Sequence, residues 1–295
     1  MPAIKLYSIL LLGIICISFA SIFVRFCEDV PSLMIATYRL TIAATILILY
    51  GVTKKDKKEF KISKKDFFLC LISGCFLSLH FILWFISLKL TSVASSVVLV
   101  TTSPIFLGII SFFILKTKLP PSIAFSIAIS FIGTVLIATS DSNVFSQFNL
   151  QALTGDILAL TGGLMSCLYL LIGSFQRKKQ TTFAYILYVY ASSAILLTIL
   201  SLLFNVPFTG YKTQSYVFMI LLAIVSQLTG HSCFNWALKH FRVESVAIVI
   251  LGEPIGASIL AYFIFKESID TLQLAGIALI LWAIRISTKR GIIIN

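Results

Sequence analysis

The stretch SLKLTSVASSVVLVTTSPIFLGIISFFILKTK, residues 87–118, decides how this chain folds. A second stretch, ALKHFRVESVAIVILGEPIGASILAYFIFKES at residues 237–268, follows it at an offset of 150 residues. Ten of the 32 aligned positions are identical without a gap, among them the pairs Lys89/Lys239 and Pro104/Pro254. Apolar background supplies some of these matches. A matched lysine and a matched proline in apolar surroundings indicate an internal repeat.

Composition places both copies in a membrane. Of the 295 residues, 59% are hydrophobic and 12% are charged, and the mean hydropathy is +1.03. Apolar runs of 18 or more residues predict spans, which must be helical because only a helix satisfies its own backbone in lipid. The first run is longer than the apolar core of a cleaved signal peptide, so we expect it to remain as a span. We predict ten spans, at 4–24, 31–52, 66–88, 92–115, 120–140, 154–175, 181–204, 215–238, 242–264 and 270–288.

The basic residues predict the orientation of these spans. The net charge of +12 lies in the short gaps between apolar runs, which argues against a nucleic-acid partner. With a cytoplasmic N-terminus, the inner segments carry 18 Lys and Arg and the outer segments carry 4. The Lys-rich connection at 54–65 is a topology determinant or a lipid-binding patch. We predict a multi-pass protein of the cell inner (plasma) membrane with both termini cytoplasmic.

The repeat organises the whole chain into two halves, at 1–141 and 154–290. Each half holds five predicted spans, and an odd number makes the second half enter the membrane from the opposite side. We therefore predict an all-α membrane protein of ten transmembrane helices, built as two inverted five-helix repeats. Inverted copies can exchange conformations, so this plan favours alternating access over a static scaffold.

Five stretches in both halves carry a family resemblance: YRLTIAA (38–44), SLKLTSVASSVVLVTTSPIF (87–106), GDILALTGGLMSCLYLLIG (155–173), GHSCFNWALK (230–239) and LGEPIGASILAYFIFKE (251–267). They resemble the EamA branch of the drug/metabolite transporter superfamily. One departure is Thr117, which stands where this family often has an acidic residue and where the second half has Glu267. The resemblance covers nearly the whole chain and implies a ten-helix carrier, but it does not specify the solute.

Two prolines predict broken helices near the middle of the fourth and ninth spans. Pro104 and Pro254 each remove a backbone hydrogen bond and leave carbonyls free at membrane depth. Such carbonyls are tolerated against protein or a water-filled cavity. Thr102 lies just before the first proline, and Glu253 directly precedes the second. Matched breaks indicate a central binding site, with a packing kink as the alternative.

Two charged residues lie inside predicted spans. Glu253 lies near mid-span, where an acidic group costs ~2.5–3.5 kcal/mol. It is a proton-coupling or solute-binding carboxylate, or a structural group at the helix break. Arg39 lies about a third of the way into the second span from its outer end, and it cannot shed its charge. Its guanidinium binds a solute carboxylate or phosphate, pairs with an acidic group, or extends to the outer surface.

Two histidines, His80 and His231, lie in the third and eighth spans, one position apart at the repeat offset. Each is about two-thirds along its span, so we expect them near opposite faces of the membrane. They suit a proton relay, or they are neutral groups bonded to a neighbouring helix. Asn235 and Trp236 lie one turn beyond His231 and are candidates to line the same cavity.

Enzyme motifs are absent from the sequence. It has no HExxH, GxSxG or P-loop, and its six cysteines lack metal-ligand spacing. We expect no catalytic residue, cofactor or metal; the expected partners are a small-molecule solute and membrane lipid, and a homodimer stays open. We predict a secondary transporter that exports a small metabolite or drug-like solute, by proton coupling or exchange. The alternatives are a channel-like pore and a membrane-embedded protein without transport function.

Overall fold

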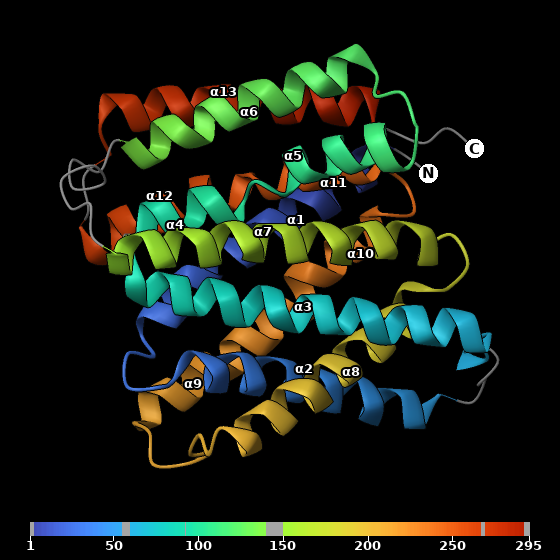
Figure 1. Ribbon diagram of the computed structural model, residues 1–295, viewed down its shortest axis with the longest axis vertical. Helices are drawn as coiled ribbons and strands as arrows, with labels where there is room; N and C mark the ends of the chain where they lie inside the picture. Colours follow the sequence, from blue (N-terminus) through green and yellow to red (C-terminus); the bar gives the residue numbers. More distant parts are fainter. Residues whose placement is uncertain (1–2, 55–59, 92, 140–149, 267–268, 292–295) are drawn as a thin grey trace. The chain divides into compact units, whose positions relative to one another are not determined.

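The computed structural model describes residues 3–54, 60–91, 93–139, 150–266 and 269–291 (Figure 1). These residues form helices, and no β-strand occurs among them. Within the described part, nine helices are long and apolar enough to cross a membrane, and Pro121–Ile137 is a shorter apolar helix. The predicted all-α fold is confirmed. Part of the Lys-rich connection, the loop at 140–149 and Glu267 lie outside the described residues.

Seven of the spans are continuous α-helices whose ends lie within four residues of the predicted bounds. Local signals explain several of their starts. Pro121 opens α6, where its missing N–H breaks no helical bond. The Thr181 hydroxyl caps α8 by accepting from Ala184 N at 3.1 Å, and Asp270 caps α13 by accepting from Gln273 N at 2.7 Å. The seven are α1 (Ala3–Arg25), α2 (Ser32–Thr53), α3 (Lys64–Leu90), α6 (Pro121–Thr139), α7 (Leu150–Gln176), α8 (Thr182–Leu203) and α13 (Thr271–Arg290).

The remaining three spans are interrupted, and the two predicted breaks are confirmed. The fourth span is α4 (Val93–Val100), α5 (Ser103–Ile109) and the π-helical η2 (Ile110–Ile114), and the ninth is α11 (Val243–Ile250) and α12 (Gly252–Phe265). The prolines occupy the first turns of α5 and α12, where the missing N–H is tolerated. The eighth span is α9 (Thr213–Leu221), a ten-residue π-helix η3 (Leu222–His231) and α10 (Ser232–Ala237). This π-helix was not predicted; such segments are frequent at functional sites.

Contacts divide the chain into two compact units that cut across its halves. Unit 1 comprises Met1–Ile82 and Leu168–Lys239, and unit 2 comprises Leu83–Cys167 and His240–Asn295. Helices α3 and α7 each contribute to both units. Each unit therefore contains spans from the first and from the second half.

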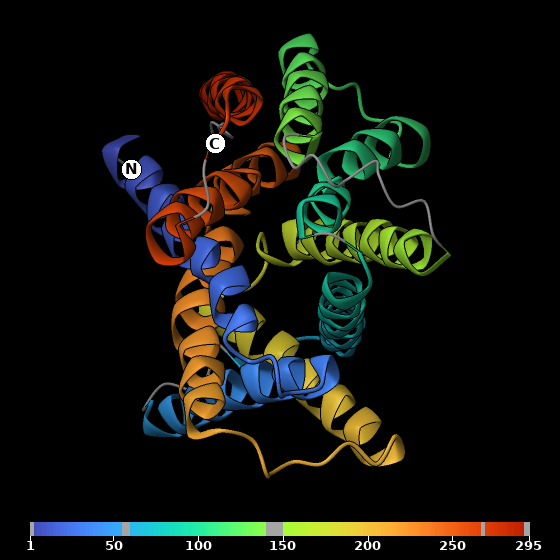
Figure 2. The same ribbon diagram turned by 90° about the vertical axis from the view of Figure 1, so that its left-hand side faces the viewer.

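In unit 1, α1 lies beside η3 and α2 lies beside α8 (Figure 2). Gly230 allows the first approach, because a Cβ on it would lie only 2.7 Å from Ile17 Cγ2. The Ser226 hydroxyl adds a bond of 3.1 Å to the Cys16 carbonyl. These contacts fix the π-helix that carries Gln227 and His231 against the rest of the unit.

At one end of unit 1, Asp29 links the connection between α1 and α2 to the start of α9. Its carboxylate accepts from Lys212 N at 2.8 Å and from the Ser215 hydroxyl at 2.5 Å, so it caps the start of α9. The hydrogen bond from the Ser215 hydroxyl lowers the pKa of Asp29 most, and the bond from Lys212 N lowers it further. The carboxylate therefore stays ionised and holds the α1–α2 connection to α9.

In unit 2, α6 and α13 lie side by side (Figure 1). Glycines allow their backbones to meet, because a Cβ on Gly133 would lie 2.7 Å from the Gly276 carbonyl oxygen. Apolar side chains of these helices pack with α11 and α12 in two clusters. The clusters are Ile123, Ile129, Ile248 and Ala283, and Ile137, Leu251, Ile255 and Ile280.

Candidate functional site

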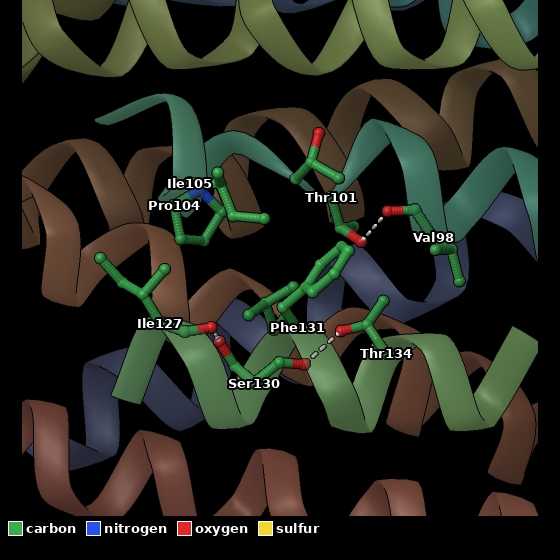
Figure 3. A pocket seen from close by; sticks show the side chains of 10 residues that line it. Val98, Thr101, Pro104, Ile105, Ile127, Ser130, Phe131 and Thr134 are labelled. Atoms are coloured by element: carbon green, nitrogen blue, oxygen red, sulfur yellow. Dashed lines mark hydrogen bonds between the residues drawn. The ribbon is translucent and has the colours of Figure 1, made fainter. Parts of the chain in front are cut away.

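A pocket in unit 2 lies where the broken fourth span faces α6 (Figure 3). Thr102 and Pro104 line it, and Leu251 adds the break of the ninth span. Its cavity volume is about 10 Å³, room for about one water molecule. In this conformation the pocket is therefore too small for most metabolites.

The hydroxyls of this pocket are occupied by their own helices (Figure 3). Thr102 Oγ1 donates to the Leu99 carbonyl at 2.7 Å, and Thr134 Oγ1 donates to the Ser130 carbonyl at 2.8 Å. The Thr101 hydroxyl likewise bonds within α4, with 2.7 Å to the Val97 carbonyl. The bonds of Thr101 and Thr102 satisfy carbonyls of α4 just before the break, so Thr102 has a structural role at its predicted position.

Glu253 and Pro254 lie at the second break of unit 2. Glu253 is half-buried in the first turn of α12, between Gly252 and Pro254, which are both buried. The helix dipole favours a negative charge at that end. This position suits a structural carboxylate as well as a coupling carboxylate.

A buried polar cluster lies in unit 1, and Arg39 is its charged member. The side chain is 0% exposed, so the alternative in which Arg39 extends to the surface is wrong. Its Nε donates to Gln227 Oε1 at 2.8 Å, and its Cζ lies 4.1 Å from the centre of the Phe81 ring. A guanidinium on a ring face is stabilised by the ring quadrupole, more strongly when water is excluded.

Phe81 also brings the two histidines together. Its ring centre lies 4.9 Å from that of His80 and 5.5 Å from that of His231. The prediction that they lie near opposite membrane faces is wrong. The two spans run in opposite directions, so positions two-thirds along each of them differ in depth by only a third of a span. A third of a span is about 10 Å at ~1.5 Å per residue. One aromatic ring bridges that distance.

Asn235 ties the cluster together from α10. Its Nδ2 lies 2.6 Å from the Tyr169 hydroxyl, 3.4 Å from the Tyr190 hydroxyl and 2.9 Å from the His231 carbonyl. The Tyr190 hydroxyl also lies 3.4 Å from the Gln227 carbonyl. Trp236 follows on α10 and is half-buried. We call Arg39, Phe81, His80, Tyr169, Tyr190, Gln227, His231 and Asn235 the polar cluster.

Arg177 connects this cluster to the turn between α7 and α8. Its Nε donates to the Asn235 carbonyl at 2.9 Å, and its Nη2 donates to the Thr182 hydroxyl at 2.6 Å. A third bond joins Nη1 to the Gln180 carbonyl. The Arg177 side chain is buried, although its position just after the sixth predicted span suggested a basic residue in a loop. Movement of the α7–α8 turn would therefore move Asn235.

The predicted site residues divide between the two units. Arg39, His80, His231 and Asn235 come together in unit 1, whereas the candidates at the proline breaks belong to unit 2. Sequence reasoning missed Gln227, Tyr169 and Tyr190. The lone amide of Gln227 in an apolar span was a usable signal, because such groups need a partner in a membrane.

Comparison with known proteins identifies relatives of this chain. The model of the EamA-like transporter family matches residues 4–139 and again residues 153–288. A protein of Archaeoglobus fulgidus is 22% identical over 84% of this chain and 85% of its own length. One of Clostridium kluyveri is 25% identical over 81% of this chain and 78% of its own length. Both are named uncharacterized transporters.

A solved crystal structure shows the same fold. That protein is 16% identical to this chain, and the two superpose with a TM-score of 0.81 over 98% of each chain. At this identity the likeness concerns the fold alone. The two family matches coincide with the two halves of the repeat, and each covers five spans.

Proposed function

Because the chain belongs to the EamA-like transporter family, we propose that it is a secondary transporter that exports a small metabolite or drug-like solute by alternating access. The double match to one family model supports two inverted repeats able to exchange conformations. Drive by a proton gradient, or exchange against a second solute, is part of this proposal. The proposal also includes the orientation with both termini cytoplasmic. It is supported by the 18 Lys and Arg on the inner segments against 4 on the outer segments.

The polar cluster is the observation that carries this proposal. Its residues come from both halves: α2 and α3 of the first, and α7, α8, η3 and α10 of the second. A charged side chain inside a span is expensive and is found where function needs it. A binding site between exchanging halves needs residues from both, and this cluster supplies them.

The proposal is tested by solute exchange. A metabolite screen by thermal unfolding of the purified protein first finds compounds that raise its unfolding midpoint. A radiolabelled hit is then added to liposomes that contain the protein and the same unlabelled compound. A carrier accumulates label transiently and saturates, with protein-free liposomes as the control. Flux that neither saturates nor responds to solute on the far side would favour the channel-like alternative.

A further inference from the structure

We propose that Gln227 and Asn235 recognise uncharged hydrogen-bonding groups of the solute: Gln227 Nε2 donates to an acceptor, and Asn235 Oδ1 accepts from a donor. Hydroxyl and amide groups provide both roles. This inference rests on the proposed function and specifies the solute class: small compounds that carry a hydroxyl or an amide. It begins with two buried atoms, Gln227 Nε2 and Asn235 Oδ1, that find no hydrogen-bond partner among the described residues.

The orientation of the Gln227 amide is fixed by Arg39. A guanidinium donates hydrogen bonds and accepts none, so the atom of Gln227 that faces Arg39 Nε at 2.8 Å must be the oxygen. Nε2 is then the atom left over. The Gln227 side chain is 0% exposed, so this donor is shielded from bulk water in the present conformation.

The orientation of the Asn235 amide is fixed in a similar way. The His231 carbonyl oxygen accepts hydrogen bonds and donates none, so the atom of Asn235 that lies 2.9 Å from it must be Nδ2. Oδ1 is therefore the free acceptor. Exchanging the two amide atoms would bring two oxygens together and would remove this bond, so it does not satisfy the site.

Leaving such groups without partners is costly. A buried unsatisfied donor or acceptor costs about 1–3 kcal/mol, and the chain carries both on the same span. Apolar residues of similar size would avoid this cost if the amides served only packing. A solute that supplies one acceptor and one donor removes it, so the closed site favours polar solutes over their deoxy analogues.

The location of the two amides suits this task. Both belong to the interrupted eighth span, on η3 and α10. The Tyr190 hydroxyl lies 3.4 Å from the backbone carbonyl of Gln227 and 3.4 Å from Asn235 Nδ2. Asn235 is fully buried, but its neighbours His231 and Trp236 are half-buried. The amides therefore lie beside residues that the rest of the chain covers only in part.

The test uses matched pairs of probes on the purified full-length protein. The pairs are lactate with propionate, ribose with 2-deoxyribose, and glutamine with norvaline. Binding is measured from the rise of the unfolding midpoint with probe concentration. For at least one pair we expect the polar member to bind about 10-fold or more tightly, because sites built for a hydrogen bond reject analogues that lack it.

Two variants assign this preference to Gln227. Gln227→Glu keeps an oxygen for Arg39 and replaces the Nε2 donor by a second oxygen acceptor, which adds a negative charge beside the guanidinium. Gln227→Met removes both polar atoms at similar length. In both, the preference should fall to about 2-fold or less. Gln176→Met is the matched control, because Gln176 is buried with both amide atoms engaged, at 3.2 Å to Asp66 and 2.7 Å to Gln180. The control should keep the preference.

Three results would overturn the assignment. These are equal binding of the members of every pair, no binding by any probe, and an unchanged preference in Gln227→Glu. Equal binding of the members of every pair would result if a buried water formed hydrogen bonds with both amides. Solute exchange is read separately in liposomes. Exchange without the preference defeats this assignment and leaves the proposed function standing, whereas absence of exchange defeats the proposed function itself.

Discussion

Replacing Arg39 by lysine is expected to lower solute exchange about 100-fold or more in liposomes with equal amounts of protein. The guanidinium donates through Nε to Gln227 and covers the Phe81 ring at 4.1 Å. Lysine has no donor at the Nε position and no planar group to stack. A hydrogen bond from a charged group contributes about 1.5–3 kcal/mol, and a desolvated cation–π contact adds about 2 kcal/mol. The hydrogen bond and the cation–π contact together therefore contribute more than the ~2.7 kcal/mol that a 100-fold change requires.

The control for this loss is Arg285→Lys, the same substitution at an exposed position on α13. It should keep at least about half of the exchange rate, since surface substitutions have small effects. Unfolding midpoints of both variants show whether folded protein is being compared. Undiminished exchange in Arg39→Lys would leave Arg39 as a packing residue and would remove the cluster from the transport mechanism.

Replacing Glu253 by glutamine is expected to reduce transport driven by a pH gradient about 10-fold or more, while solute exchange stays within about 2-fold. Glu253 is half-buried in the first turn of α12, at the break beside Pro254. Glutamine is similar in size to a protonated carboxyl group and cannot release or take up a proton, so the substitution removes any proton transfer at this position. Exchange need not move a net proton, so it survives. Both activities are measured in the same liposomes.

Glu244→Gln is the matched control for that experiment. Glu244 is buried in the first turn of α11, where it accepts from the Ser111 hydroxyl at 2.9 Å and lies 3.4 Å from Arg242 Nε. It therefore joins two spans of unit 2. Its substitution should lower the unfolding midpoint and leave pH-driven transport per folded protein in place. Intact pH-driven transport in Glu253→Gln would assign Glu253 to the helix break alone.

Hydropathy and proline positions predicted the membrane helices well because both act locally. Apolar runs set the span lengths, and Pro104 and Pro254 lie in the first turns after the two breaks. The π-helix η3 carries no such local signal. It is held by contacts with α1, which lies some 200 residues away in the sequence, such as the bond from Ser226 to Cys16.

The polar cluster was only partly predictable for a related reason. A charge or an imidazole in a span is conspicuous, so Arg39 and His231 were found. Tyr169 and Tyr190 look like ordinary aromatic residues of a membrane helix, and only tertiary contact with Asn235 gives them a role. Arg177 was misleading because its position just after a span suggests solvent, whereas its three bonds to backbone and hydroxyl oxygens bury it.

The most direct measurement is the reactivity of a cysteine at position 231. His231→Cys is made with the six native cysteines replaced, and an impermeant maleimide is applied to right-side-out and to inside-out vesicles. Leu197→Cys, in the core of α8, serves as the unreactive control. Alternating access at the polar cluster predicts that position 231 reacts from both sides of the membrane. Reaction from neither side, or from one side only under every condition, would contradict it.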